Sequence, residues 1–172
     1  MRMRTAALAT IAAATLSTVL VAAPAQAVTQ NDITINVSDG LCLVIPQSNP
    51  YNGQVVQRRW CNGTNAQNGN RVDAGAHYFK IQSATWPQFC LNNWTSCGAV
   101  GAEIKLYKCD SNDSAFNIVG VDFGNHYQFQ PKAASKNCST MTGQNAGDPM
   151  RLAPCSDNGS NSRFRLFPAG NG

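Results

Sequence analysis

The sequence has few charged residues, and acidic residues are the scarcer kind. Charged side chains make up 13% of the 172 residues, and Glu103 is the only glutamate beside eight aspartates. Glycoside hydrolysis needs two carboxyl groups in a cleft that separates their pKa values, and no such pair is indicated. Hydrolase, metalloprotease and phosphate-loop motifs are also missing. We therefore expect no catalytic activity, no metal site and no cofactor.

Basic residues are too dispersed to indicate a nucleic-acid partner. The 13 lysines and arginines give a formal net charge of +4, and they are scattered along the chain. Proteins that bind nucleic acids gather such residues in a stripe that neutralises phosphates. Beyond the first 27 residues, no apolar run is long enough to span a bilayer. We expect neither a nucleic-acid partner nor a membrane span.

The first 27 residues have the pattern of a secretory signal peptide. Met1–Arg4 carries two arginines, Ala6–Ala23 is apolar, and Ala25–Ala27 supplies small residues for a cleavage site. This combination is typical of an exported protein rather than of a retained membrane anchor. Cleavage after Ala27 would leave 145 residues. It would remove two arginines and no acidic residue, which lowers the net charge from +4 to +2. We expect residues 28–172 to form one secreted domain.

The most regular feature of the sequence is a repeat of 48 residues. Each unit carries an apolar residue, a cysteine, and a glycine followed by a second apolar residue and a second cysteine. The members are Ile33, Ile81 and Phe129; Cys42, Cys90 and Cys138; Gly53, Val56 and Cys61; Gly101, Ile104 and Cys109; and Gly147, Met150 and Cys155. The third unit is two residues shorter before its glycine. Units of this size pack against one another to bury their apolar faces, and three of them indicate closure around a threefold axis. They span approximately residues 31–78, 79–126 and 127–172.

The repeat also predicts how the cysteines pair. All seven lie after the predicted signal peptide, and an exported protein can form disulfides. Cys97 has no counterpart in the other units, so it is a free thiol, the site of an intermolecular bridge, or the true partner of Cys90 or Cys109. The symmetry of the repeat favours an unpaired Cys97 and one bridge inside each unit. These bridges join Cys42 to Cys61, Cys90 to Cys109, and Cys138 to Cys155.

Short runs of β-branched and aromatic residues predict an all-β fold. Residues 32–37, 78–81 and 126–129 have strand character, and turn signals such as Asn52-Gly53 and Asn158-Gly159 separate runs of this kind. No stretch keeps a helical period over three turns. About four strands in each of three units, with one disulfide per unit, describe a β-trefoil.

With these features the chain resembles the ricin B-type lectin family, whose units carry the two cysteines, the glycine–apolar step and a Gln-x-Trp motif. The resemblance covers about residues 32–167. Phe116 and Phe164 stand at the tryptophan position, Ser114 and Ser162 replace the glutamine, and Gln67 has no aromatic residue two positions later. We expect both phenylalanines to point into the core, where burial of each stabilises the fold by about 1.5 to 3 kcal/mol.

The resemblance also implies where a sugar would bind. In the family, an acidic residue follows the first cysteine of a unit by two positions, an aromatic residue lies just before the second cysteine, and an asparagine follows it. In the second unit these positions hold Asn92, Tyr107 and Asn117. An amide both donates and accepts hydrogen bonds, so Asn92 can replace the acid. Trp94 lies in a turn-rich loop, where we expect it to be exposed and to take part in binding. Asn92 and Tyr107 also have local explanations, as a turn residue and as cover for a surface strand.

The other two units match this pattern less well. The first has Val44 and Arg59 at the acidic and aromatic positions, and the third has Thr140 and Ala153. A valine cannot accept a hydrogen bond from a sugar hydroxyl, and an alanine provides no ring. Trp60, which stands beside a repeat position, is expected to pack within the fold. The sequence therefore predicts that a sugar site lies in the second unit.

These features predict a secreted carbohydrate-binding module with no catalytic activity, whose partner is a glycan or a glycoprotein surface. The second hypothesis is a trefoil that has lost sugar binding and acts through protein contacts, as an inhibitor or as an accessory subunit like the lectin-like chains of cytolethal distending toxins. The missing acidic residue in all three units favours this hypothesis, whereas Asn92, Trp94 and Tyr107 together favour sugar binding.

Overall fold

The structure is a computed structural model that describes residues 29–37, 40–45, 49–94, 98–111, 115–120, 126–134, 136–157 and 159–168, without the side chains of 29–37, 117–120 and 168. The predicted signal peptide and Cys97 lie outside these ranges and stay predictions. The described residues contain no helix long and apolar enough to cross a membrane.

Within the described ranges the chain forms twelve strands and two single turns of 3-10 helix, as an all-β fold requires. The elements are β1 (Thr29–Val37), β2 (Leu41–Val44), β3 (Gln57–Trp60), η1 (Asn65–Gln67), β4 (Asn68–Asp73), β5 (Tyr78–Ser83), β6 (Phe89–Asn93), β7 (Ile104–Lys108), β8 (Phe116–Gly120), β9 (Tyr127–Pro131), β10 (Asn137–Met141), β11 (Met150–Pro154), η3 (Ser160–Ser162) and β12 (Phe164–Pro168).

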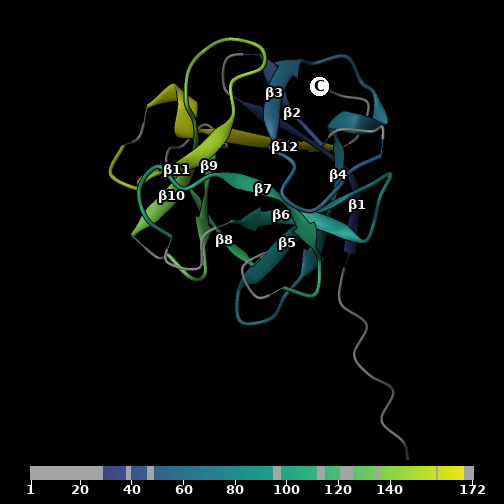
Figure 1. The fold of residues 1–172 in the computed structure, drawn as a ribbon, viewed down its shortest axis with the longest axis horizontal. Helices are drawn as coiled ribbons and strands as arrows, with labels where there is room; N and C mark the ends of the chain where they lie inside the picture. The colour runs from purple at the N-terminus through teal and green to yellow at the C-terminus, as the bar shows by residue number, and fades with distance from the viewer. Residues whose placement is uncertain are drawn as a thin grey trace, which may run out of the picture.

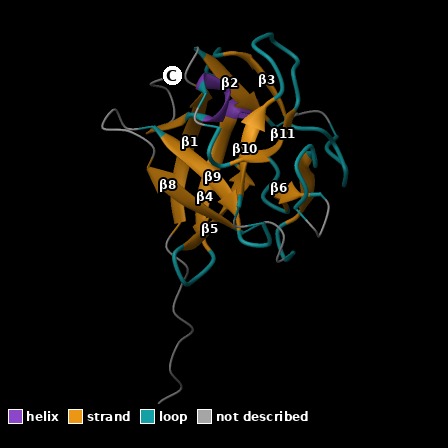
Figure 2. Cartoon of the chain, turned by 90° about the vertical axis from the view of Figure 1, so that its left-hand side faces the viewer, coloured by secondary structure: helices purple, strands orange, loops and turns teal. Residues whose placement is uncertain are grey.

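Six of these strands form a closed antiparallel barrel. They pair in the order β1–β4–β5–β8–β9–β12, and β12 pairs with β1 to close the ring. The other six strands form three hairpins, β2–β3, β6–β7 and β10–β11. Figure 1 shows the units as sectors, with β5–β8 at the bottom and β10–β11 at the left, and Figure 2 shows the barrel strands β1, β4, β5, β8 and β9 together. The arrangement confirms the predicted β-trefoil of three units.

The three hairpins are joined to one another by backbone bridges. Val55, beside β3, pairs with Lys105 on β7, and Gln57 pairs with Pro149, beside β11. Glu103, beside β7, pairs with Arg151 on β11. Each hairpin therefore contacts both of the others, and the position of each depends on its neighbours.

The core is built from residues at equivalent positions of the three units. Phe129 stacks on Phe164 with ring centroids 4.6 Å apart, and Phe116 is also buried, which confirms the predicted orientation of Phe116 and Phe164. Close packing of this kind accounts for the stabilisation that buried aromatic rings provide. Aliphatic and sulfur-containing side chains at related positions complete the core: Leu43 and Leu91; Val56, Ile104 and Met150; Leu106 and Leu152.

The repeated glycine and cysteine residues have a structural explanation. Gly53, Gly101 and Gly147 have φ of 89°, 85° and 101°, a left-handed conformation that side chains with a Cβ rarely adopt. All three predicted disulfides are present, with Cα–Cα distances of 5.0, 4.9 and 4.8 Å from the first unit to the third. The Cys90–Cys109 bridge excludes a pairing of Cys97 with either residue.

Two residues of the first unit depart from the threefold pattern. Arg58 occupies the position that Leu106 and Leu152 hold in the other units, and its side chain is fully buried. Trp60 is 70% exposed, so the prediction that it packs within the fold is wrong. Trp60 is the last residue of β3, and its backbone pairs with Leu41, the first residue of β2.

Candidate functional site

The β6–β7 hairpin brings four of its side chains to one face. Asn92 pairs with Lys105 across the hairpin, and Cys90 pairs with Tyr107. Directly paired residues point to the same side of an antiparallel sheet, and so do residues two apart in one strand. Asn92, Lys105 and Tyr107 therefore share the outer side, and Trp94 follows in the same direction. We call these four residues the aromatic face.

The rings of Trp94 and Tyr107 are in contact. They meet edge to face, with centroids 5.9 Å apart and planes at 73°. The Lys105 ammonium lies 5.1 Å from the centre of a Trp94 ring, within the range of a cation–π interaction. Trp94 remains 39% exposed, as the sequence predicts. The two rings thus form an accessible surface that is apolar at its centre and positive at its edge.

A glycine of the first unit supports the Trp94 ring. A Cβ atom on Gly53 would lie 2.8 Å from Trp94 Cη2, closer than such atoms approach in proteins. The Gly53 amide also donates to the Leu106 carbonyl oxygen at 2.9 Å, which fixes the turn against β7. The absence of a side chain at Gly53 therefore allows the indole to lie against the backbone of a neighbouring unit.

The two predicted asparagines are placed differently from the rings. Asn92 is only 4% exposed, and its Nδ2 donates to Ser111 Oγ at 3.3 Å. Asn92 is therefore the buried member of the aromatic face, and its amide does not project into solvent. Asn117 is on β8, where its backbone pairs with Tyr78 and Gln130, and its side chain lies outside the described part of the chain. The structure thus brings Trp94 and Tyr107 together. The role of the Asn117 side chain stays a prediction.

The corresponding face of the third unit contains a cavity of about 410 Å³. Thr140 pairs with Arg151 across β10–β11, in the register that joins Asn92 and Lys105 in the second unit. The volume lies within the range of about 300 to 1,000 Å³ that is usual for small-molecule sites. The residues around this third-unit cavity are Val100, Gly101, Thr140, Met141, Thr142, Arg151, Leu152, Asp157, Gly159, Ser160, Asn161 and Ser162.

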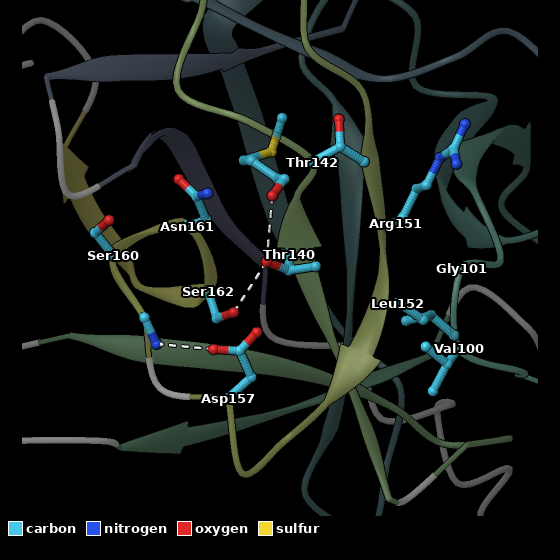
Figure 3. Close-up of a pocket in the computed structure, with 12 residues that line it drawn as sticks. Val100, Gly101, Thr140, Thr142, Arg151, Leu152, Asp157, Ser160, Asn161 and Ser162 are labelled. Atoms are coloured by element: carbon cyan, nitrogen blue, oxygen red, sulfur yellow. Dashed lines mark hydrogen bonds between the residues drawn. The ribbon is translucent and has the colours of Figure 1, made fainter.

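One wall of the third-unit cavity is polar. Ser162 Oγ donates to Thr140 Oγ1 at 2.9 Å, and the Gly159 amide donates to Asp157 Oδ1 at 3.4 Å. Figure 3 shows Asp157, Ser162 and Thr140 directed toward one another, with Ser160 and Asn161 on the adjoining turn of η3. A carboxylate, hydroxyls and an amide together can accept and donate hydrogen bonds to a ligand rich in hydroxyl groups.

An ion network joins the two faces. Glu103 Oε2 lies 2.7 Å from Lys105 Nζ, and Glu103 Oε1 lies 3.4 Å from Arg151 Nη2. The hydrogen bond from Lys105 and the positive charges of Lys105 and Arg151 hold the pKa of Glu103 below its usual value, against the opposing effect of burial. Lys105 belongs to the aromatic face and Arg151 to the third-unit cavity, so one carboxylate contacts both.

Arg58 reaches the third-unit cavity from the first unit. Its Nη1 donates to Asn161 Oδ1 at 3.5 Å, and its Nε donates to the Asn145 carbonyl oxygen at 3.3 Å. Its Nη2 lies 3.8 Å from Asp148 Oδ2. Because these partners all belong to the third unit, Arg58 holds the Asn145–Asp148 turn and the amide of Asn161 in place.

The sequence pattern does not identify Asp157 as a lining residue of the third-unit cavity. The family pattern places the acidic residue two positions after the first cysteine of a unit, where Thr140 stands. Asp157 instead follows the second cysteine of its unit, Cys155, by two positions, and Ser111 has the same offset from Cys109. Ser111 is the hydrogen-bond partner of Asn92, so the two offsets lie close together in the fold. An aspartate two positions after the second cysteine of a unit is therefore the sequence feature that indicates this carboxylate.

Among the described residues, no group of three or more histidine, cysteine, aspartate or glutamate side chains could hold a metal ion. No protein-family model and no curated protein sequence matches this chain.

Solved structures share the fold at low sequence identity. ThreeFoil, a designed 3-fold symmetric protein, has a TM-score of 0.72 and 16% identity, covering 79% of this chain and 97% of its own. The Rhizoctonia solani agglutinin has a TM-score of 0.69 and 12% identity, covering 87% of this chain and 99% of its own. The Haemophilus ducreyi cytolethal distending toxin has a TM-score of 0.63 and 14% identity, covering 81% of this chain and 84% of the matched toxin chain. These likenesses show the β-trefoil fold and confirm the predicted resemblance at that level.

Proposed function

We propose that the protein is a secreted carbohydrate-binding module without catalytic activity, and that its principal glycan site is the aromatic face of the second unit. The observation that carries this proposal is the contact between Trp94 and Tyr107, which presents two rings on one accessible face. Aromatic rings offer an apolar surface to the C–H groups of a sugar, and nearby polar groups fix its orientation. Asn92 and Asn117 are the proposed partners of the sugar hydroxyls.

The third-unit cavity is a second candidate site for the same function. It provides a carboxylate on Asp157, a hydroxyl on Thr140 and an amide on Asn161 around one hollow. It has no aromatic side chain among its lining residues, so we expect weaker binding than at the aromatic face. A glycan with two suitable residues could engage both sites, with a gain in avidity.

One observation favours the protein-contact hypothesis. Asn92 is buried and bonded to Ser111, so a sugar hydroxyl would have to displace or share that hydrogen bond. The likeness to a toxin chain is compatible with this hypothesis. The proposal and its alternative therefore differ in whether the rings meet a sugar or a protein surface.

A glycan array on the oxidised protein, followed by calorimetric titration of the best ligand, tests the proposal. We expect Trp94→Ala and Tyr107→Ala each to weaken binding by at least about tenfold, since aromatic residues at the centre of a site contribute most of its binding energy. Trp60→Ala is the matched control, because Trp60 is an exposed tryptophan of the first unit. It should bind like the unchanged protein.

The possible outcomes separate the sites and the hypotheses. Binding that survives both ring substitutions but is lost in Asp157→Asn would place the glycan in the third-unit cavity. Binding that survives all three would contradict both sites. Failure to bind any glycan on the array would favour a role through protein contacts.

A further inference from the structure

A further cavity lies against the disulfide of the second unit. It has a volume of about 270 Å³, and we call it the lysine cavity. It shares no residue with the aromatic face or the third-unit cavity. Its lining residues are Val72, Asp73, Ala74, Lys80, Gln82, Cys90, Cys109, Ala115 and Lys132.

The register of the barrel strands places Lys80 at this cavity. Lys80 pairs with Val72 across β4–β5, and Gln82 pairs with Cys90 across β5–β6. Along β5 the buried residues alternate with Tyr78, Lys80 and Gln82, which therefore point to the outer side of the barrel. Lys80 Nζ donates to the Cys109 carbonyl oxygen, which holds the ammonium beside the disulfide and leaves two of its three N–H groups for other partners.

The second lysine comes from a different unit. Lys132 follows β9, and its backbone amide donates to the Ala115 carbonyl oxygen at 2.9 Å. Its ammonium lies 5.2 Å from the centre of the Tyr78 ring. Because Tyr78 and Lys80 are two apart on the same side of β5, the ring directs Lys132 toward the side of the barrel on which Lys80 lies.

Within the described ranges, neither ammonium forms an ion pair with a carboxylate. The ion pairs of the described residues join Arg58 to Asp148 and Glu103 to Lys105 and Arg151, and none includes Lys80 or Lys132. Asp73 also lines the cavity, but its Oδ1 accepts a hydrogen bond from the Gly75 amide at 3.0 Å, within its own turn. Asp73 pairs with Phe79, so it belongs to the opposite side of the strand from Val72 and Lys80.

We propose that the lysine cavity binds a doubly charged tetrahedral oxyanion, such as sulfate, either free or as a substituent of a sugar. The two positive charges at this cavity repel each other, and a bound anion removes this repulsion. Ammonium groups form charge-assisted hydrogen bonds with such oxygens. The volume lies below the usual range for drug-sized ligands, so it suits an ion or a single substituent rather than an oligosaccharide.

Titration of the oxidised protein with sodium sulfate, followed by amide NMR at ionic strength held constant with sodium chloride, tests this proposal. We expect saturable shifts of the Lys80, Ala115 and Lys132 amide signals. Lys80→Gln and Lys132→Gln should each weaken sulfate binding by about tenfold or more, because each removes charge-assisted hydrogen bonds. Lys136→Gln, at an exposed lysine outside the lining, is the matched control and should leave binding unchanged.

Lys132→Gln keeps the test decisive even if Lys80→Gln fails to fold, because the Lys132 side chain is exposed. Equal shifts in chloride and sulfate, or equal affinity in Lys132→Gln and Lys136→Gln, would overturn the proposal. Galactose 6-sulfate and galactose distinguish the source of the anion. Tighter binding of galactose 6-sulfate than of inorganic sulfate indicates a sulfated glycan, and the reverse order indicates a free anion; either result supports the site.

The lysine cavity can be tested separately from the proposed function. Sulfate binding should be unchanged in Tyr107→Ala, because Tyr107 is not among the lining residues. If unsulfated glycans fail to bind while sulfate binds, the aromatic face is contradicted and the lysine cavity is supported. Binding of galactose alone that Lys132→Gln weakens would contradict the oxyanion assignment.

Discussion

The second and third hairpins have the same backbone register and present different chemistry. In β6–β7 the outer side carries Trp94 and Tyr107 in contact, with Lys105 over the indole. In β10–β11 the same side borders a cavity with Asp157 and Thr140. The shared register shows that the repeat determines where a site can be built. The side chains at its outer positions then determine what each site can bind.

Both sites depend on the first unit. Gly53 gives Trp94 the space it occupies, and Arg58 holds Asn161 at the third-unit cavity. The first unit has Val44 and Arg59 where the resembled family has its acidic and aromatic residues, so it does not match the family pattern. It therefore contributes more to its neighbours' sites than to one of its own. The following changes test how far the two sites differ in this dependence.

The largest effect is expected from Arg58. Arg58→Ala should lower the free energy of unfolding by about 3 to 5 kcal/mol, because it removes a fully buried side chain and the hydrogen bonds to Asn145 and Asn161. Arg58→Leu introduces the residue found at the related positions Leu106 and Leu152, so it should recover most of that loss. Urea unfolding measures both values.

Arg58→Leu also separates stability from binding. It should weaken ligand binding at the third-unit cavity, because Asn161 loses its partner, and leave the aromatic face unchanged. Equal weakening at both sites would contradict the view that Arg58 supports only the third unit.

A smaller change of opposite sign is expected from Asn93. Asn93 is fully buried, and both polar atoms of its amide lack a hydrogen-bond partner among the described residues. The related positions hold Ile45 and Met141. Asn93→Met should therefore raise the free energy of unfolding by about 1 to 3 kcal/mol, since it removes unsatisfied buried polar groups. Thermal unfolding should show a higher Tm, and a lower Tm would indicate that an internal water satisfies the amide.

Gly53→Ala tests the support of the aromatic face. Its φ of 89° and the 2.8 Å approach of Trp94 predict both backbone strain and displacement of the ring. We expect a loss of about 1 to 2 kcal/mol from the left-handed backbone alone, together with a change in tryptophan fluorescence. Gly147→Ala is the matched control, because Gly147 has a φ of 101° and open space at its Cβ position. The control should lose similar stability with no change in fluorescence.

The smallest effect is expected from Glu103, which joins the two sites. Its pKa is lowered in the folded protein, chiefly by the hydrogen bond from Lys105. The ionised carboxylate therefore stabilises the fold at pH values above its unfolded pKa, and this contribution is lost as pH falls through the lower folded pKa. The contribution should be below about 1 kcal/mol, because the pair is partly exposed to solvent.

Glu103→Gln should accordingly differ from the unchanged protein above pH 5 and converge with it in acid. Urea unfolding at several pH values measures the difference. A difference that grows in acid would contradict this assignment.

The fold could be predicted from the sequence because its markers have strict geometric causes. Gly53, Gly101 and Gly147 all need a left-handed backbone. The six paired cysteines form one disulfide at the equivalent hairpin of each unit. The site was harder to predict. The carboxylate of the third-unit cavity belongs to Asp157, two positions after the second cysteine of its unit, whereas the family pattern points to Thr140, two positions after the first cysteine. Only the fold shows that both residues line one cavity.

Arg58 and Trp60 show why the rest could not be predicted. In the sequence, Arg58 has the charge of a surface residue and Trp60 the apolarity of a core residue, and the structure reverses both. Arg58 is buried because polar partners from another unit reach it, and Trp60 is exposed because its strand ends there. The partners that bury Arg58 belong to a different unit, so the sequence of the first unit alone does not reveal them.

The backbone bridges between the hairpins bear on how the protein could be shortened or recombined. Since Val55 pairs with Lys105, Gln57 with Pro149, and Glu103 with Arg151, removing any one unit deprives both remaining hairpins of a backbone partner. A fragment of one or two units would therefore lose support for the site it retains. To transfer either candidate site to another trefoil, the Gly53 turn or the Arg58 strand would have to be transferred together with the hairpin. The smallest transferable segment is therefore larger than one repeat.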